Sequence, residues 1–220
     1  MEPFEQDNNP FVNKIDVVYY INLDHRTDRK KELLQELDKI GVPSSKIVRI
    51  SGNYNKKYGD VGCSKSHVDA MKQFSQSSHN NCIIFEDDFT FIQTPNEVQK
   101  MFNQLFEHNV KYDVVMLSAN TSKSEDSEYP FLKKVLESQT ASGYMVNKSF
   151  ANTLLANYED SVQHLEHITS TDNSERAPYC IDQYWKRLQP TSLWYEFHPK
   201  LGIQRESYSD IQHGVVKPTT

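Results

Sequence analysis

Long apolar runs and a leader segment are both missing from this sequence of 220 residues. No stretch approaches the roughly 18 apolar residues that a membrane-spanning helix needs. The first ten residues also lack the basic start and the apolar core of a signal peptide. These absences predict a cytoplasmic protein with no transmembrane segment.

Cysteine and positive charge are also scarce. Cys63, Cys82 and Cys180 are too few and too scattered for a disulfide framework, and no Cys-x-x-Cys pair indicates a zinc site. The 24 lysines and arginines are outnumbered by 30 aspartates and glutamates, which leaves a net charge of −6. Because clusters of lysine and arginine bind phosphate backbones, this balance argues against nucleic acid as the main partner. It does not exclude a nucleotide, which needs only a few local contacts.

The sequence does contain the alternating strands and helices that are typical of an α/β domain. Residues 16–23 form a β-branched and aromatic run that predicts a buried strand. A helical pattern follows and closes at Gly41, and a second short strand is expected at residues 46–50. Strand, helix and strand at this spacing form a βαβ unit, which implies a parallel pair of strands.

The pattern continues along the chain and then weakens. Further strands are expected at residues 81–85 and 112–117, with a helix between them that begins at a capping box over residues 94–97. Residues 118–127 are rich in serine, glutamate and lysine and predict a mobile loop. The tail from Trp194 onward is expected to be irregular.

No linker divides the chain into independent parts. We expect a flexible N-terminal segment over residues 1–13 and a single domain over residues 14–220. A strand at residues 141–146 would begin the second half of that domain.

Three adjacent carboxylates, Glu86, Asp87 and Asp88, follow the strand expected at residues 81–85. Adjacent carboxylates repel one another, so they weaken the fold unless a partner neutralises them. Ligands in open α/β sheets bind outside the carboxyl ends of the strands, and carboxylate oxygens suit Mg²⁺ or Mn²⁺. The cluster therefore predicts a site for a hard divalent cation or, as the alternative, an exposed acidic turn.

Two helix starts carry polar side chains that suit an anion. Arg26 and Arg29 flank the start of the first helix, where guanidinium groups beside free N–H groups form either an anion site or a solvated helix start. At the second helix start, Ser66 and His67 follow Gly62 in a glycine turn that leads into the helix. This turn lacks the spacing of a Walker loop.

Asp182 lies beside Gln183 and Trp185 in a short helical pattern. A carboxylate near an aromatic wall can accept the proton of a sugar hydroxyl, and the alternative is an interaction with the helix dipole. In the tail, His213 follows Asp210 at a spacing of three residues, which by itself indicates little.

In combination these motifs resemble glycosyltransferase family 25, which includes lipopolysaccharide glycosyltransferases of bacteria and collagen hydroxylysine galactosyltransferases. The resemblance spans roughly residues 15–213, and its motifs fall in the family's order. They are Tyr20 to Arg29 (YINLDHRTDR), Gly62-Cys63 with Ser66-His67, Ile84 to Asp88 (IFEDD), Ser142-Gly143-Tyr144 and Asp182-Gln183.

The resemblance implies a GT-A type fold, which is a Rossmann-like mixed sheet flanked by helices. It also implies a metal-dependent inverting transfer of a hexose from a UDP-sugar to a hydroxyl, with Mn²⁺ or Mg²⁺ as cofactor. The partners would be the UDP-sugar donor and a glycan or hydroxylysine acceptor, as in lipopolysaccharide biosynthesis or collagen glycosylation. The nucleotide-binding half would cover about residues 14–118 and the acceptor half about residues 138–220.

The resemblance also suggests roles for individual residues. Asp182 would be the catalytic base, and Glu86, Asp88 and His213 would be metal ligands, with Asp210 as the alternative to His213. The positions expected at the nucleotide or the sugar are Asn22, Arg26, Arg29, Ser66, His67, Asp87 and Tyr144.

Two departures from the family pattern bear on the acceptor. From its length of 220 residues we expect no tandem second transferase domain like that of animal collagen enzymes, and residues 118–137 match nothing in the pattern. Two other functions stay open on the sequence alone. One is a non-catalytic module that binds a nucleotide sugar, and the other is a metal-dependent nucleotidyltransferase or phosphodiesterase.

Overall fold

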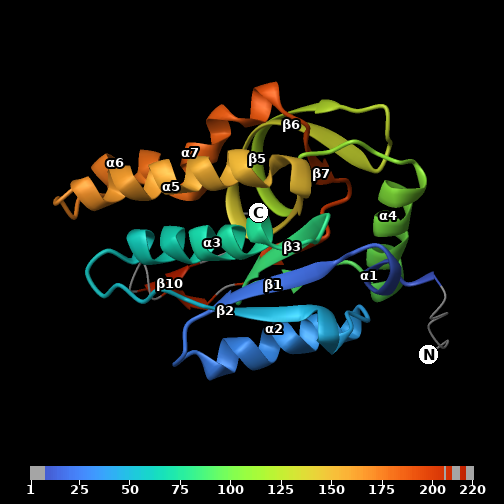
Figure 1. Cartoon of the computed structure of the whole chain (residues 1–220), viewed down its shortest axis with the longest axis horizontal. Helices are drawn as coiled ribbons and strands as arrows, with labels where there is room; N and C mark the ends of the chain where they lie inside the picture. Colours follow the sequence, from blue (N-terminus) through green and yellow to red (C-terminus); the bar gives the residue numbers. More distant parts are fainter. Residues whose placement is uncertain (1–7, 206, 210–213, 217–220) are drawn as a thin grey trace.

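The computed structural model describes residues 8–205, 207–209 and 214–216. Six strands form one mixed sheet in the order β2-β1-β3-β6-β5-β7. In Figure 1, α3 and α5 cover one face of this sheet and α2 covers the other. The strands of the sheet are β1 (Val17–Asn22), β2 (Ile47–Ser51), β3 (Asn81–Glu86), β5 (Val114–Asp126), β6 (Leu132–Asn147) and β7 (Trp194–Phe197). This architecture confirms the predicted α/β fold with a mixed sheet flanked by helices.

Short strand pairs and helices complete the chain. The remaining strands are β4 (Phe89–Phe91), which pairs with β8 (Gly202–Gln204), and β9 (Ser207–Ser209), which pairs with β10 (Gly214–Val216). The α-helices are α1 (Pro10–Asn13), α2 (Thr27–Lys39), α3 (Gly59–Gln76), α4 (Pro95–Glu107), α5 (Ala151–His167), α6 (Asn173–Arg176) and α7 (Ile181–Tyr184). Single 3₁₀ turns lie at η2 (Ser44–Lys46), η3 (Lys148–Phe150), η4 (Ala177–Tyr179), η5 (Trp185–Arg187) and η6 (Gln189–Thr191). Within these described ranges, no helix is long and apolar enough to cross a membrane.

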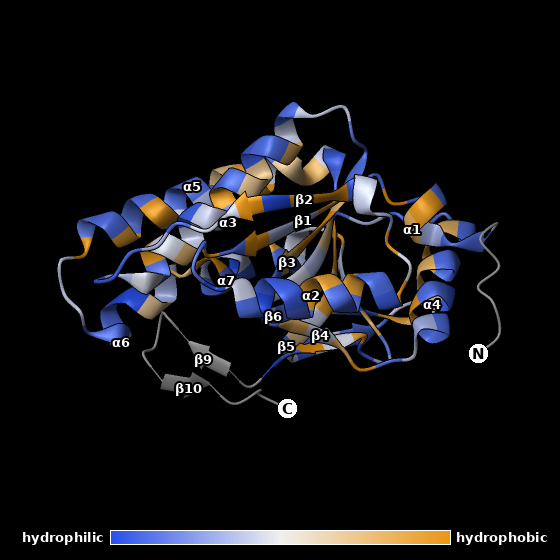
Figure 2. Ribbon diagram, turned by 90° about the horizontal axis from the view of Figure 1, so that it is seen from below, coloured by the Kyte–Doolittle hydropathy of each residue, from blue (hydrophilic) through white to orange (hydrophobic). Residues whose placement is uncertain are grey.

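The first half of the sheet is parallel, as the βαβ pattern predicts. Strand β1 lies between β2 and β3 and runs parallel to both. Val18 and Tyr20 pack in the core on one face of β1, while Val17 and Tyr19 pack in the core on the other. Burial on both faces explains why this strand reads as a continuous apolar run. Figure 2 shows central strands with many hydrophobic residues, whereas the surrounding helices carry both hydrophobic and hydrophilic residues.

Helix α4 begins where its capping signal predicts. The Thr94 side chain accepts a hydrogen bond from the backbone N–H of Glu97, and the Glu97 carboxylate accepts one in return from the Thr94 backbone. The segment expected to be flexible, residues 1–13, includes helix α1. There Phe11 is fully buried, and its ring lies 5.0 Å from that of Phe102.

The second half of the sheet consists of an antiparallel hairpin of β5 and β6, with β7 added parallel to β5. The prediction of a mobile loop at residues 118–127 is wrong. Strand β5 continues to Asp126 and pairs with β6 through several register shifts. The side chains of residues 123–126 are exposed, so they follow no apolar pattern, while their backbone still pairs with β6. The tail is also more regular than expected, because β7 and β8 both pair with earlier strands.

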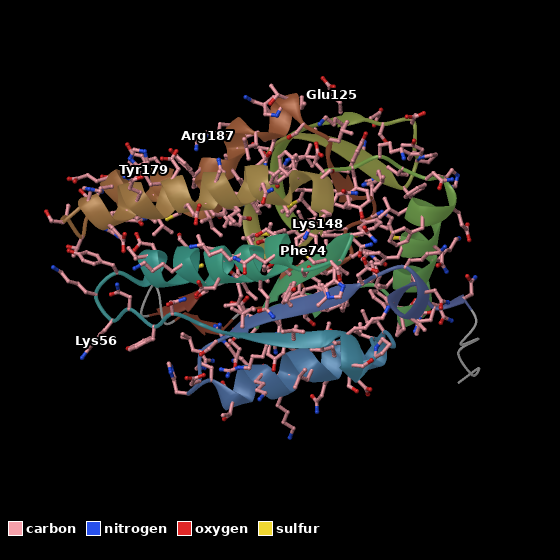
Figure 3. All side chains as sticks on the ribbon, viewed as in Figure 1. Lys56, Phe74, Glu125, Lys148, Tyr179 and Arg187 are labelled. Atoms are coloured by element: carbon pink, nitrogen blue, oxygen red, sulfur yellow. The ribbon has the colours of Figure 1, made fainter. Side chains whose placement is uncertain are left out.

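Lys148 joins the two halves on the α3 face. Its Nζ donates hydrogen bonds of 2.8, 2.9 and 2.6 Å to the carbonyl oxygens of Phe74, Ser75 and Ser77. These carbonyls close the C-terminal end of α3, where helical partners run out. Figure 3 shows Lys148 beside Phe74. The helix that carries Ser66 and His67 is therefore fixed at its far end.

Candidate active site

The carboxyl ends of three parallel strands form one wall of a pocket. It encloses about 690 Å³ of atom-free space, including its opening to solvent. The strand order places the loop after β2 at one end, the end of β1 in the middle and the end of β3 at the other. The described lining residues are Ile21, Asn22, Leu23, Arg29, Gly52, Asn53, Tyr54, Asn55, Gly59, Cys63, Ser66, Glu86, Asp87, Asp88 and Gln204. The three carboxylates predicted to act together therefore do share one pocket.

Asp87 is neutralised by the protein itself. Its Oδ2 accepts a hydrogen bond of 2.7 Å from Asn22 Nδ2, and its Oδ1 accepts one of 2.9 Å from Arg29 Nη1. Burial raises the pKa of Asp87, and the neighbouring Arg29 and Asn22 oppose that rise. The Asn22 amide also donates to the Arg26 carbonyl and accepts from Arg49. Asn22 and Asp87 therefore fasten the end of β1 to the end of β3.

Asp88 is less well satisfied. Its Oδ2 accepts from Gln204 Nε2 at 3.1 Å and lies 3.3 Å from Arg29 Nη1. Its Oδ1 is buried, and no residue in the described part of the chain donates a hydrogen bond to it. Burial and the charge of Glu86 raise the pKa of Asp88 to about 7. A buried carboxylate oxygen without a donor fits a hard divalent cation, which favours oxygen ligands.

Two glycines make room for the turn that carries this cluster. A Cβ atom on Gly143 would lie 2.6 Å from the Phe89 ring, and one on Gly202 would lie 2.2 Å from it. Phe89 directly follows Asp88 and is fully buried. Gly143 of the predicted Ser-Gly-Tyr motif therefore permits the close packing that fixes the acidic turn.

The other end of the pocket is neutral. The backbone N–H of Asn53 donates to Ser66 Oγ at 2.8 Å, and the Ser66 hydroxyl donates to the carbonyl of Gly62 at 2.8 Å. This contact holds the loop after β2 against α3. Tyr54 on this loop is 57% exposed, and its ring lies 5.4 Å from that of His25. An exposed aromatic ring on a fixed loop provides a stacking surface at the pocket.

His67 lies behind the pocket as a support for Glu86. It is fully buried, with Nε2 3.0 Å from Glu86 Oε1 and Nδ1 2.8 Å from the Tyr144 hydroxyl. Burial would raise the pKa of Glu86, but the hydrogen bonds from His67 and Cys63 and the charges of His67 and Arg29 together lower the pKa. Tyr144 is also fully buried and packs on Trp185. Neither His67 nor Tyr144 lines the pocket, and the Tyr144 side chain lies a layer behind it.

Asp182 comes from the second half of the chain. Its Oδ2 accepts a hydrogen bond of 3.1 Å from the backbone N–H of Thr140. Burial and the charge of Glu86 raise its pKa. No side-chain hydrogen bond caps the N-terminus of α7, so the carboxylate is held by β6 rather than by its own helix. Thr140 has a φ of 81°, which is strained for a β-branched residue.

Neighbouring contacts hold this strained segment of β6. Trp185 Nε1 donates to the Ser138 carbonyl at 3.0 Å. Gln183 Nε2 and Lys186 Nζ both donate to Gln139 Oε1, at 3.0 and 2.9 Å. The segment and α7 thus position one another.

Four of the described residues expected at the site do not line the pocket: Arg26, His67, Tyr144 and Asp182. The Arg26 side chain pairs with Asp28 at the start of α2 and does not line the cavity. His213 lies outside the described residues, as does its alternative Asp210.

Several residues at the site were missed from the sequence. Gln204 contacts Asp88, and Arg205 donates its backbone N–H to the Asp88 carbonyl and its Nη2 to the Asp87 carbonyl. No local pattern marks either residue, because both depend on the pairing of β8 with β4. Tyr54, by contrast, could have been predicted, because it is an aromatic residue between two asparagines just after an expected strand.

No protein-family model matches the chain. Among curated proteins, it is 23% identical over 140 aligned residues to procollagen galactosyltransferase 1-A of Xenopus laevis. The match covers 52% of this chain and 23% of that protein, so the chain spans about a quarter of its relative's length. The match supports a relationship to glycosyltransferases, and family 25 itself stays a prediction.

Solved structures are similar at low identity. A197 from STIV has a TM-score of 0.47 at 11% identity, with 94% of this chain and 95% of that chain covered. A mannose-1-phosphate geranyltransferase from Thermus thermophilus has a TM-score of 0.46 at 8% identity, covering 84% and 73%. A glycosyltransferase involved in glycosylation of the major capsid of PBCV-1 has a TM-score of 0.42 at 10% identity, covering 82% and 80%.

Proposed function

We propose that the chain is a metal-dependent glycosyltransferase that moves a hexose from a UDP-sugar to a hydroxyl acceptor with inversion. The observation that carries the proposal is the polarity of the pocket. One end holds Glu86, Asp88 and Arg29, and the other end holds the exposed ring of Tyr54. Two strand spacings, about 10 Å, separate the ends of β2 and β3. A nucleoside diphosphate has the same arrangement, with a flat neutral base at one end and charged phosphates at the other.

In this proposal the base stacks on Tyr54 and the diphosphate lies toward the end of β3. Glu86 and Asp88 would hold Mn²⁺ or Mg²⁺, because both line the pocket and Asp88 Oδ1 has no donor among the described residues. The cation, when bound, would neutralise negative charge on the leaving diphosphate. Arg29 supplies a fixed positive charge beside Asp87 and Asp88.

Asp182 is the proposed base. The Thr140 N–H holds its Oδ2, which leaves Oδ1 to accept the proton of the acceptor hydroxyl. Burial favours the protonated form of Asp182 by raising its pKa and so makes its carboxylate a better proton acceptor. The acceptor class is a glycan or a collagen-like hydroxylysine, and the similarity to a procollagen galactosyltransferase favours the second.

Product analysis tests this function. The chain is incubated with Mn²⁺ and UDP-glucose or UDP-galactose, with hydroxylysine peptides or glycans as acceptors, and nucleotide products are separated by chromatography. We expect UDP and a glycosylated acceptor, and loss of both when EDTA is added. Release of UMP or pyrophosphate would instead identify a phosphodiesterase or nucleotidyltransferase. Binding of the UDP-sugar without any product would identify a non-catalytic module.

A further inference from the structure

We propose that Cys63, His67 and Glu86 form a second cation site, for a borderline-soft cation such as Zn²⁺, which shares Glu86 with the hard-cation site at the inner wall of the pocket. The proposal rests on these side chains alone and holds whether or not the chain transfers a sugar. It was not expected from the sequence, because the three residues do not form a pattern of zinc-ligand spacing.

The fold brings three different ligand types to one point. Cys63 and His67 lie one turn apart on α3 and so share a face of that helix. Glu86 is the last residue of β3. Glu86 Oε1 lies 3.0 Å from His67 Nε2 and 3.5 Å from Cys63 Sγ, and all three ligand atoms lie within 4.8 Å of one another. Ligand atoms around a tetrahedral Zn²⁺ are about 3.3–3.8 Å apart, as its bond lengths require.

The donor set distinguishes this site from the one at Asp88. Thiolate and imidazole ligands favour zinc, whereas sites built from carboxylate oxygens favour Mg²⁺ and Mn²⁺. The side-chain groups that contact Asp88 are the nitrogens of Arg29 and Gln204, and no sulfur is among them within the described part of the chain. The pocket therefore presents two donor sets that share Glu86.

A hydrogen bond behind His67 supports its role as a metal ligand. The Tyr144 hydroxyl lies 2.8 Å from His67 Nδ1, and the two rings stack 5.8 Å apart. Metal-ligating histidines usually donate their second ring N–H to such a partner, which fixes the ring orientation. With Nδ1–H donating to Tyr144 and the Nε2 proton displaced by the cation, the Nε2 lone pair would point toward Glu86 and Cys63. A histidine that served only to fill space would not need Tyr144 at one ring nitrogen and Glu86 and Cys63 near the other.

Binding of Zn²⁺ accounts for the proton of each ligand and leaves one coordination position of the cation open. The Cys63 thiol gives its proton to solvent, and the proton that His67 Nε2 donates to Glu86 leaves that nitrogen. The His67 ring keeps a proton on Nδ1, and Glu86 binds as the carboxylate. Cys63 and Glu86 both line the pocket, so the fourth position faces the cavity and takes water. Because Glu86 serves both donor sets, zinc bound here competes with a hard cation at Asp88.

Cobalt substitution tests the site without any nucleotide. The whole chain is titrated with Co²⁺, and absorbance is followed for the thiolate-to-cobalt band in the near ultraviolet and for the visible bands of tetrahedral cobalt. We expect one equivalent to bind, with both signals, and Zn²⁺ to displace it. Cys63→Ser should lose the thiolate band, whereas the matched control Cys180→Ser should keep it. Tyr144→Phe should weaken binding by about 10-fold or more.

Three results would overturn the proposal. They are a wild-type chain with no thiolate band, a band that survives Cys63→Ser, and a band that Cys180→Ser removes. Asp88→Asn should keep the band, which separates this site from the hard-cation site. Thermal melts of each variant distinguish lost ligation from lost folding. Absence of the band in a chain that still binds UDP with Mn²⁺ would reject the zinc site and leave the proposed function standing.

Discussion

Two parts of the chain at and near the pocket differ in backbone geometry and in charge. The parallel wall, which consists of Asn22, Arg29 and Glu86 to Asp88, has ordinary backbone geometry and concentrated charge. The hairpin wall, which consists of Ser138 to Thr140 with Asp182, lies outside the residues that line the pocket, and it has little charge and a strained backbone at Thr140. Unfavourable energy is thus stored as an unsatisfied carboxylate on one wall and as a strained dihedral on the other. We infer that the parallel wall binds the donor and the hairpin wall positions the base.

The largest effect is expected from Asp88→Asn. This variant should lose metal-supported transfer and metal-dependent ligand binding, because the amide no longer offers a charged oxygen to the cation. Its metal-free fold should nevertheless be more stable, by about 1 kcal/mol or roughly 2–4 °C in Tm, since a buried carboxylate with one oxygen that no described residue donates to becomes a neutral amide. Activity assays with Mn²⁺ and melts in EDTA check both parts. Full activity would remove Asp88 from the site.

The same residue gives the pH dependence a definite sign. Burial raises the pKa of Asp88 to about 7, well above its unfolded value of about 4. The folded chain therefore holds a proton that the unfolded chain releases, so metal-free wild type should lose stability as pH rises from about 4 to 7. In Asp88→Asn that part of the decline should be missing. Parallel pH-stability curves of the two proteins would contradict this account.

Asp182→Asn tests the hairpin wall. Turnover should fall by about 10²–10⁴-fold, the range that a positioned base contributes, while the Kd for UDP with Mn²⁺ stays unchanged. The amide oxygen can still accept from Thr140, so the fold should be preserved. Steady-state kinetics and calorimetry on the same preparation provide the comparison. If UDP binding fell together with turnover, the two walls would not be separate in function.

Tyr54→Ala should weaken UDP binding by about 10-fold or more, because base stacking contributes about 1–3 kcal/mol. Binding of inorganic pyrophosphate with Mn²⁺ should be unaffected, since it has no base. Tyr54→Phe keeps the ring and should bind UDP like wild type. Tyr129→Ala, in the turn between β5 and β6, is the matched control. Equal loss for UDP and pyrophosphate would mean that Tyr54 only supports the loop.

The smallest effect is expected from Thr140→Gly. Glycine tolerates a φ of 81°, so the variant should gain up to about 1 kcal/mol of stability, measured by denaturant unfolding. Turnover should fall several-fold, because the N–H that holds Asp182 becomes less fixed. Thr140→Ala keeps the strain and should show neither change. A variant that is both less stable and fully active would show that the strain has no part in positioning the base.

The parallel wall could largely be predicted from the sequence, and the hairpin wall could not. The end of β3 follows from local apolar patterning, so the sequence alone places Glu86 to Asp88 at a strand end. Partners of these residues that lie far along the chain leave no such local pattern. Gln204 reaches Asp88 only through the pairing of β8 with β4, and Thr140 meets Asp182 only through the packing of α7 on β6.

The error at residues 118–127 has a related cause. Strand β5 extends beyond the core there, so its polar side chains carry no alternation, and only its backbone pairing with β6 makes it a strand. Backbone pairing leaves no trace in composition. Ser66 and Tyr144 were both expected near the donor. Ser66 lines the pocket, with its hydroxyl engaged by Asn53 and Gly62, whereas the Tyr144 hydroxyl contacts His67 behind the pocket.

Calorimetric titration of UDP, with and without Mn²⁺, into wild type and Asp88→Asn tests the central claim most directly. The account predicts that wild type binds UDP tightly only with Mn²⁺ and that Asp88→Asn binds it equally weakly in both conditions. A ligand at 100 times its Kd stabilises the fold by about 2.7 kcal/mol, so melts of the same samples give an independent readout. Equal binding of UDP by both proteins in Mn²⁺, or no binding by wild type with Mn²⁺, would contradict the assignment of the pocket.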